Sequence, residues 1–487
     1  MIMQLLQDMV VFSAEWTLFL GAMICLMIGT YHRGEDSYHA VQRAVLAVLL
    51  IALGCTLCAP AVGDISFGLH FTQTAATQFA KVVILSAGLG ALLLSQHGLA
   101  RIGAQRFEYP VLILLATLGM CLMVSARDLM ALYVAIELQS LALYIMAAFA
   151  RQDEKSTEAG LKYFVLGALS SGLLLYGMSM VYGTVGAIHY DAIATAMAAG
   201  PLGLAQTVAL VFILAALAFK VSAAPFHMWT PDVYQGAPTP ITAFFITAPK
   251  VAGAMVLVQM LHGPFAAAGA AWGQIIWAAA ALSLLVGGFA AIMQSNLKRL
   301  LAYSTINHVG FLLLAILAGG LNGYAALLVY LAVYVVISVG TFSAILFLQQ
   351  QGETVETLDD LRGLGARAPR TAMALAVMMF AAAGVPPTAG FLGKLYVLLA
   401  AMDAGLVWLA AFGVITSVVA TFYYLRIIKL MYFDEAPAPV ILPKVAIVRR
   451  LALLVALSVV LILGWMIMPQ SLVGPATHAA RTIGLGN

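Results

Sequence analysis

The stretch Leu204–Met228 reads LAQTVALVFILAALAFKVSAAPFHM and contains the features that decide the fold. It is long enough to cross a bilayer as a helix, which takes about 17–25 mostly apolar residues. Within it stand a charged residue, Lys220, and a proline, Pro225. Charges and helix breaks are tolerated at membrane depth only beside other protein or water. The stretch therefore predicts a membrane-spanning helix with a polar, protein-enclosed side.

The rest of the chain is similarly apolar. Hydrophobic residues occupy 63% of the 487 positions, and Asp, Glu, Lys and Arg only 9%, against about 25% charged residues in a soluble domain. A net charge of +3 is too small and too dispersed for a protein that neutralises nucleic-acid phosphates. The composition indicates an integral membrane protein in contact with lipid and excludes a nucleic-acid partner.

Apolar runs of spanning length recur about fourteen times, which predicts an all-α integral membrane protein. The runs are Val10–Thr30, Arg43–Cys58, Phe79–Ser95, Tyr109–Ser125, Leu129–Phe149, Glu158–Tyr182, Leu204–Met228, Pro240–His262, Ala270–Ser295, Leu300–Gly319, Gly323–Leu348, Arg370–Ala401, Trp408–Met431 and Arg450–Met468. Between the second and third runs, apolar and polar residues alternate over positions 64–72. A period of two is typical of a strand, so we expect a small external hairpin there.

Basic residues are distributed unequally between the two sets of loops. The loops after odd-numbered runs hold 17 Lys and Arg, whereas the opposite loops and the termini hold only Arg127 and Arg481. Cytoplasmic loops of membrane proteins carry the excess of basic residues. Because the number of spans is even, both termini lie on one side, and we expect that side to face away from the cytoplasm.

The four remaining lysines, Lys81, Lys220, Lys250 and Lys394, lie inside predicted spans. We interpret Lys81 as structural, because it is near a helix end from which its stem can reach the interface. Lys250 lies about 15 Å from either end of its span, and Lys220 about 12 Å from the inner end. Each such lysine costs at least about 2.5–3.5 kcal/mol on insertion scales. Three of them on different helices predict proton-carrying sites rather than an ion pair that only holds helices together.

Glu137 is the acidic residue that we place deep within a span, about 12 Å from its outer end. A buried carboxylate needs a cation nearby, and Lys220 is the first candidate because its depth is comparable. A lysine is neutralised by burial and recharged by an approaching carboxylate, so such a pair can load and release a proton. His308, with Tyr303, Ser304 and Asn307 on the tenth span, is a candidate relay, although a structural histidine would have the same neighbours.

One proline and a proline pair indicate an internal repeat. Pro225 lies near the end of the seventh span, and Pro386 and Pro387 interrupt the twelfth. Helices 4–8 and 9–13 form two sets of five with the broken helix fourth in each, so the second set must enter from the opposite face. We expect an N-terminal unit (1–100), two inverted five-helix repeats (101–262 and 263–433) and a C-terminal helix with a short tail (434–487).

Four motifs resemble those of one protein family. They are FKVSAAPFHMWTPDVYQGAPTPITAF (219–244), TAPK (247–250), NLKRLLAYSTINHVG (296–310) and GVPPTAGFLGK (384–394). Together they resemble the antiporter-like membrane subunits of proton-pumping NADH:quinone oxidoreductase, respiratory complex I, and its subunit N in particular. The resemblance extends over essentially the whole chain, and PDVYQGAP is its most specific part.

The resemblance implies a role for each buried residue. Glu137 is the glutamate of the fifth helix and Lys220 its partner on the seventh. Lys250 is the connecting lysine of the eighth helix, and Lys394 is the twelfth-helix lysine nearest the exit side. His308 falls on the tenth-helix histidine of related subunits. A lysine at position 394 suits subunit N better than the sister subunit that has glutamate there.

The resemblance also implies the setting. The chain is expected in the inner membrane of a bacterium, bound to other membrane subunits of complex I that include sister antiporter-like subunits. NADH, FMN, iron–sulfur clusters and quinone are implied in partner subunits, and no cofactor or metal is expected on this chain. Its function would be to couple quinone reduction elsewhere to proton transfer through the buried lysines and glutamate.

Two other functions remain open from the sequence. A cation/proton antiporter subunit, stand-alone or in a complex, predicts an oxygen-rich cation site with acidic residues near the middle of the membrane. A structural membrane anchor predicts that Lys250 can be replaced by an apolar residue at little functional expense.

Overall fold

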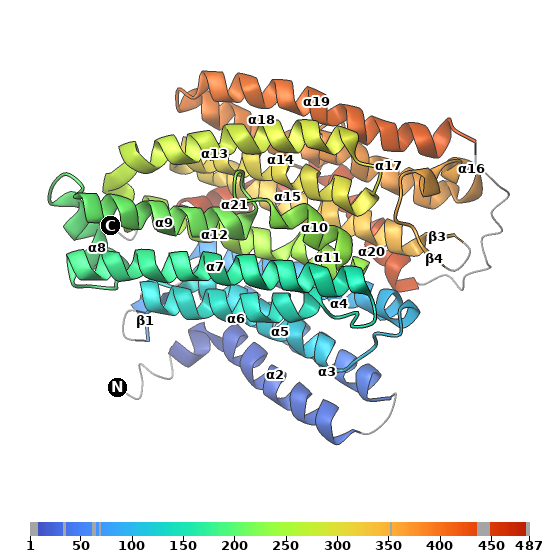
Figure 1. The fold of residues 1–487 in the computed structure, drawn as a ribbon, viewed down its shortest axis with the longest axis horizontal. Coiled ribbons are helices and arrows are strands. Elements are labelled where there is room, and N and C mark those ends of the chain that lie inside the picture. The colour runs from blue at the N-terminus through green and yellow to red at the C-terminus, as the bar shows by residue number, and fades with distance from the viewer. Residues whose placement is uncertain are drawn as a thin grey trace.

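The computed structural model describes residues 8–32, 36–60, 65–67, 70–350, 353–435 and 449–483. Long helices lie roughly alongside one another and form a single bundle (Figure 1). The first half of the chain contains α2 (Ser13–Tyr31), α3 (Asp36–Cys58), α4 (Ala75–Arg101), α5 (Glu108–Ser125), α6 (Leu129–Ala147), α7 (Glu154–Val185), α8 (Tyr190–Ala198), α9 (Leu204–Val221), α10 (Trp229–Gly236), α11 (Thr239–Phe245) and α12 (Ala248–His262). The second half contains α13 (Gly269–Ala290), α14 (Leu297–Ala318), α15 (Gly320–Phe347), α16 (Leu364–Arg367), α17 (Pro369–Ala383), α18 (Ala389–Asp403), α19 (Val407–Tyr432), α20 (Arg449–Ile467) and α21 (Gln470–Ala480).

The spans agree with the all-α prediction. Among the described residues, thirteen helical segments are long and apolar enough to cross a membrane, with α11 and α12 counted together. The remaining predicted span, the twelfth, is the broken pair α17 and α18, each 15 residues long. The second span is longer than the sequence predicts, because α3 begins at Asp36 rather than at Arg43. The chain is thus a multi-pass, all-α membrane protein.

Both ends of the described chain lie at the same end of the bundle. The carboxylate of Asp8 accepts a hydrogen bond from the backbone of Phe67, and the hydroxyl of Thr482 accepts one from the backbone of Ala76 at the start of α4. The short helix α8 lies at this end too, whereas α16, β3 (Gln349–Gln350) and β4 (Glu353–Thr354) lie at the opposite end (Figure 1). An even number of spans places both ends of a chain on the same side of the membrane, as observed here.

The loop expected to form a hairpin contains a short antiparallel pair. β1 (Ile65–Ser66) pairs with β2 (Phe71–Thr72), and Ile65 faces Thr72 in the register. Positions 64, 68 and 69 of the expected hairpin lie outside the described residues.

Two helices lie where the sequence predicts only loop or tail. α8 buries Tyr190, Ile193 and Met197 on one face, and α21 packs against α4 and α15. Both are shorter than a membrane span, so a search for long apolar runs passes over them. Their amphipathic spacing is the signal that would have identified them.

Close helix contacts support the two five-helix repeats. A methyl group at Gly119 on α5 would lie 2.7 Å from the backbone nitrogen of Gln139 on α6, and one at Gly287 on α13 would lie 2.2 Å from that of Asn307 on α14. Gly119 and Gly287 are 168 positions apart, and so are Gln139 and Asn307. The first two helices of each set therefore pack through equivalent positions.

The seventh and twelfth helices are both broken, but the seventh does not end where its proline stands. α9 ends at Val221, and Ser222 follows in the left-handed conformation with φ 67°. The helix resumes as α10, so its second half extends beyond the predicted limit at Met228. In the twelfth helix, α17 ends at Ala383, and Gly384 follows with φ 83°, before Pro386 and Pro387. Each break starts with a left-handed residue three positions before a proline.

The eighth helix is also broken, contrary to the continuous span predicted from Pro240 to His262. α11 ends at Phe245, and α12 starts at Ala248 with Pro249 in its first turn. Proline is well accommodated in a first helical turn, where its missing N–H is not needed. Pro249 therefore marks the start of a new helix, and Lys250 follows it immediately.

The contact at Gly287 predicts a strong effect of a single methyl group. We expect Gly287→Ala to separate α13 from α14 and to lower the thermal midpoint and the amount of protein in the membrane, because backbone atoms cannot move aside as a flexible side chain can. The matched control is Gly172→Ala on α7, where a methyl group would meet nothing within 4 Å. Equal thermal midpoints for the two variants would contradict the packing described here.

Candidate functional site

Glu137 and Lys220 lie on the same polar face but are bridged rather than paired directly. The hydroxyl of Ser171 on α7 donates a hydrogen bond to the carboxylate of Glu137 on α6. The hydroxyl oxygen of Ser171 also lies 3.5 Å from the Lys220 ammonium on α9. No ion pair joins the two charged residues within the described structure, so Ser171 provides the hydrogen-bonded connection between them.

Lys220 has two further partners on α6. Its nitrogen donates to the hydroxyl of Ser140 at 2.8 Å and lies 3.4 Å from the hydroxyl of Tyr144. Lysine has three donors and no acceptor, so three oxygens satisfy the ammonium group. Ser140 and Tyr144 follow Glu137 by three and seven positions, which places all three side chains on one face of the helix.

Lys250 is anchored at the break of the seventh helix. Its side chain is only 1% exposed, and its nitrogen donates a hydrogen bond of 2.5 Å to the hydroxyl of Ser222. Ser222 in turn accepts from Thr230 on α10 at 2.7 Å. Because Ser222 follows Lys220 by two positions, the helix break connects the surroundings of the two lysines.

Aromatic rings surround this connection. The Lys250 nitrogen lies 5.0 Å from the centre of the Trp229 ring and 5.9 Å from that of Tyr234. Trp229 stacks on Tyr163 with ring centres 4.4 Å apart, and its indole N–H donates to the backbone oxygen of Phe219. The electron-rich faces of these rings stabilise a cation that has few polar partners.

His308 is held by two tyrosines. Its Nδ1 lies 2.7 Å from the hydroxyl of Tyr330, and its Nε2 lies 3.2 Å from that of Tyr424. Tyr424 also hydrogen-bonds to Ser304. Both ring nitrogens therefore have a hydroxyl partner that can donate or accept, which is the chemistry that a proton relay requires.

A small cavity lies beside His308, with a mostly apolar lining that includes several polar side chains. It has a volume of about 20 Å³ and is lined in part by Ile246 at the break of the eighth helix, Thr305, His308 and Ser338. A cavity needs about 10–15 Å³ to hold one water molecule and two to four polar partners to retain it. Its volume meets the first condition, and the side chains of Thr305, His308 and Ser338 provide polar partners.

Lys394 lies on α18, and its ammonium group closes the break of the twelfth helix. It donates to the backbone oxygen of Ala383 at 2.8 Å and to the hydroxyl of Ser417 on α19 at 2.9 Å. Ala383 is the last residue of α17, so its carbonyl has no partner within that helix. The lysine satisfies this carbonyl while obtaining a partner for its own charge.

Asp232 on α10 joins the two repeats at the end of the bundle opposite the termini. Its carboxylate accepts from Lys162 on α7 at 2.9 Å and from Arg299 on α14 at 2.6 Å. Beside it lies an open cleft of about 260 Å³, lined by charged residues that include Arg151 and the buried Lys298. The cleft brings polar surface close to the short helices α10 and α11.

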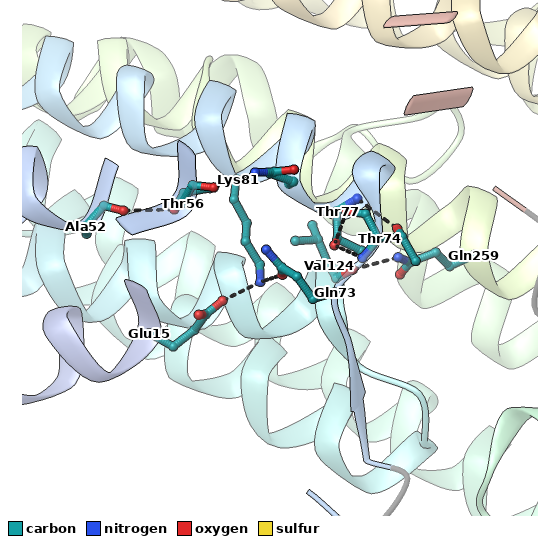
Figure 2. A network of polar contacts seen from close by, with 10 residues as sticks. Glu15, Ala52, Thr56, Gln73, Thr74, Thr77, Lys81, Val124 and Gln259 are labelled. Atoms are coloured by element: carbon teal, nitrogen blue, oxygen red, sulfur yellow. Dashed lines mark hydrogen bonds and ion pairs between the residues drawn. The ribbon is translucent and has the colours of Figure 1, made fainter. Parts of the chain in front are cut away.

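Lys81 does not reach the membrane interface as the sequence suggests. It is 0% exposed and forms an ion pair of 2.6 Å with Glu15 on α2. Figure 2 shows its side chain extended toward Glu15 and Gln73, whose side-chain oxygen accepts from it at 2.5 Å. The Phe12 ring lies 4.9 Å from the ammonium. Glu15 is therefore a buried carboxylate that the sequence does not predict, whereas Glu137 is only half-buried.

The structure places the predicted residues in two groups. Glu137, Lys220 and Lys250 converge around the first broken helix, while His308 and Lys394 lie on the helices of the second repeat. The bridging hydroxyls were not predicted. They are Ser140, Ser171, Ser222, Ser417, Tyr330 and Tyr424. For Ser140 the helical spacing from Glu137 was an available signal, whereas Ser171 and Ser417 needed the tertiary structure.

Comparison with known proteins connects this arrangement to one family. The profile described as "NADH:quinone oxidoreductase/Mrp antiporter, TM" matches residues 126–420. A protein of Rhodospirillum rubrum named NADH-quinone oxidoreductase subunit N is 52% identical over 422 residues, which cover 86% of each chain. A protein of the same name from Paramagnetospirillum magneticum is 46% identical over 98% of both chains.

Solved structures share the fold. A chain of respiratory complex I from Thermus thermophilus is 31% identical, with a TM-score of 0.77 over 95% of this chain and 98% of that one. The Mrp complex of Dietzia contains a chain with a TM-score of 0.79 at 21% identity, which covers 98% of this chain and 97% of that one. The latter likeness concerns the fold alone.

The buried ion pair predicts non-additive effects. We expect Lys81→Met to lower the thermal midpoint strongly, because removal of one partner leaves an unpaired buried charge and costs about 3–5 kcal/mol. The double variant Glu15→Gln with Lys81→Met should recover most of this loss, since neither charge remains. Thermal unfolding of the purified protein measures both. A double variant less stable than Lys81→Met would contradict the pairing.

Proposed function

The chain belongs to the subunit N family of NADH-quinone oxidoreductases. We therefore propose that its row of buried lysines, Lys220, Lys250 and Lys394, carries protons across the membrane. The supporting observation is that every lysine of the row contacts a hydroxyl group within hydrogen-bonding distance. Hydroxyl groups both donate and accept, so they pass protons between ionisable groups that do not touch.

In this proposal Glu137 is the switch that sets the charge of Lys220. A carboxylate that stays ionised favours the charged lysine, and one that is neutralised or withdrawn lets burial favour the neutral amine. Ser171 connects the two groups, so movement of α6 relative to α7 alters their coupling. Energy released by quinone reduction in other subunits arrives at Glu137 as a change of charge or position.

The perturbation then passes along the membrane plane to Lys250 and Lys394. Ser222 joins the break beside Lys220 to Lys250. A water molecule in the cavity lined by Ile246 and His308 completes the next step. His308, Tyr330 and Lys394 belong to the second repeat, from which the proton leaves.

The proposed orientation of the chain follows from the positive-inside rule. Both ends of the chain face the periplasm of the bacterial inner membrane, and the cleft lined by Arg151 and Lys298 opens to the cytoplasm. Protons enter from this cleft beneath α10, which Asp232 holds against both repeats. Arg33 and Lys444, two of the basic residues behind this orientation, lie outside the described residues.

The chain is a subunit of an oxidoreductase complex in which the redox centres are expected elsewhere. NADH, FMN, the iron–sulfur clusters and quinone are assigned to partner subunits. Its own contribution is the translocation step, in contact with neighbouring membrane subunits and lipid.

The antiporter alternative requires an oxygen-rich cation site. Of the described carboxylates, Glu15 has a lysine partner at 2.6 Å, and Glu137 is joined to Lys220 through a serine. Each of these two carboxylates is balanced by a lysine, and the buried Asp128 lies with His70 and His189 rather than with other acidic groups. Proton transfer therefore suits these residues better than cation exchange.

Lys250 provides the most direct test. We expect Lys250→Ala, in assembled complex in native membranes, to lower NADH-driven quinone reduction and proton pumping by about 10-fold or more, because general acid–base groups contribute about 10²–10⁴-fold. The control is Lys429→Ala, since Lys429 is exposed and paired with Asp434. Normal rates of both reactions with Lys250→Ala would contradict the proton-transfer role and favour a structural membrane anchor.

Ser171 tests the bridge itself. We expect Ser171→Ala to assemble normally and to lower proton pumping by about 10-fold, since a hydrogen bond to a charged group contributes about 1.5–3 kcal/mol. Ser179→Ala is the matched control, because Ser179 lies on the same helix and bonds only to the backbone of Tyr176. Pumping is measured by acidification of inverted vesicles. Equal rates for the two serine variants would exclude Ser171 from the path.

A further inference from the structure

A second cluster of ionisable residues lies outside the proposed proton path. His70, Asp128 and His189 meet at the end of the bundle where both ends of the described chain lie. Their ligand atoms all lie within 4.8 Å of one another, and His70 Nδ1 is 2.8 Å from the Asp128 carboxylate. We propose that these three residues bind a divalent transition-metal ion of the zinc class. The residues are about 60 positions apart in the sequence, which explains why no metal was expected.

The backbone around the cluster is held rigidly by short bridges. Phe71 pairs with Ala126, and Asp128 pairs with His189, both in antiparallel fashion. The backbone nitrogen of Arg127 also donates to the oxygen of His70 at 2.8 Å. Three separate segments of the chain thus form a platform that fixes the positions of the three side chains. A metal site needs such a preformed support.

The carboxylate of Asp128 has one oxygen available for a metal. Its Oδ1 caps α6 by accepting from the backbone nitrogens of Met130 and Ala131 at 2.9 and 2.8 Å. Its Oδ2 faces His70. Asp128 is 1% exposed, so its orientation is fixed by these hydrogen bonds, as is usual for a carboxylate that ligates a metal.

His189 provides the second, independent indication. Its Nδ1 is buried and has no hydrogen-bond partner within the described structure, although buried polar atoms are nearly always satisfied. The His189 ring lies 5.2 Å from the His70 ring, centre to centre. A metal ion between the two rings and Oδ2 would satisfy the unpartnered nitrogen.

The donor set selects the class of ion. Two imidazole nitrogens and a carboxylate suit Zn²⁺ and similar ions, whereas Mg²⁺ and Ca²⁺ prefer oxygen ligands alone. Three protein ligands leave a fourth position for water. The side chain of His70 is 47% exposed, which gives the ion a route from solvent. The nearby Arg127 guanidinium is neutralised by Asp191 at 2.6 Å, so it does not repel a cation.

A bound ion would connect the hairpin, the start of α6 and the segment between α7 and α8. These are the external ends of the two helices that carry Glu137 and Ser171. The site would therefore hold the two helices together without belonging to the proton path, and the inference stands independently of the proposed function.

Binding of ZnCl₂ to the intact complex tests the site. After dialysis against a mild chelator, we expect equilibrium dialysis with radioactive zinc to show one site fewer, or an affinity at least about 10-fold lower, for His189→Ala than for the unaltered complex. Asp128→Asn should have a similar effect while it still caps α6, because asparagine is an equally good cap. His478→Ala is the control, since this exposed histidine lies on α21 at the same end.

A chemical readout identifies the site in the unaltered protein. We expect zinc to protect His70 from acylation by diethylpyrocarbonate, as measured by mass spectrometry, and this protection to disappear in His189→Ala. Equal acylation of His70 with and without zinc would overturn the proposal. Equal zinc stoichiometry and affinity in the unaltered complex, His189→Ala and Asp128→Asn would also overturn it.

Discussion

A lysine ammonium inside an apolar bundle must keep hydrogen-bond partners, and the rest of the structure depends on this requirement. Lys220 bonds to hydroxyl groups of α6. Lys250 bonds to the serine at the first helix break. Lys394 bonds to a carbonyl freed at the second helix break. Helix breaks and buried lysines therefore satisfy each other's hydrogen-bonding groups, because the breaks free polar groups at depths where the backbone of an intact helix is already hydrogen-bonded.

The two repeats use one scaffold for different chemistry. Their tight contacts at Gly119 and Gly287 recur at an interval of 168 positions. The same interval relates Glu137 to Thr305 and Ser140 to His308. The first repeat thus has a carboxylate and a hydroxyl where the second has a hydroxyl and an imidazole. The proposed charge switch in the first repeat and the proposed relay in the second rest on this exchange of side chains, while the packing of the helices is retained.

The N-terminal helices also bury charged residues, but there the two opposite charges are in direct contact. Lys81 and Glu15 are matched one to one at 2.6 Å, unlike Lys220 and Glu137, which are separated by a serine. The direct pair satisfies both charges at one contact, whereas in the bridged pair the hydroxyl of Ser171 contacts both charged groups. The same types of residue are therefore structural in one part of the molecule and suited to proton transfer in another.

The sequence by itself determined the all-α class, the number of spans, the common side of the two ends and the burial of Lys220, Lys250 and Lys394, but not that of Lys81 and Lys298. These properties follow from local hydropathy, from charge and from proline, which act over one helix at a time. Tertiary structure alone decided that Ser171 bridges Glu137 and Lys220, that Lys81 pairs with Glu15, and where His189 meets Asp128. The partners in these contacts lie 34 to 66 positions apart, and their meeting depends on how whole helices pack. Hydropathy shows that a buried charge needs a partner, but only the packing of the helices selects which one.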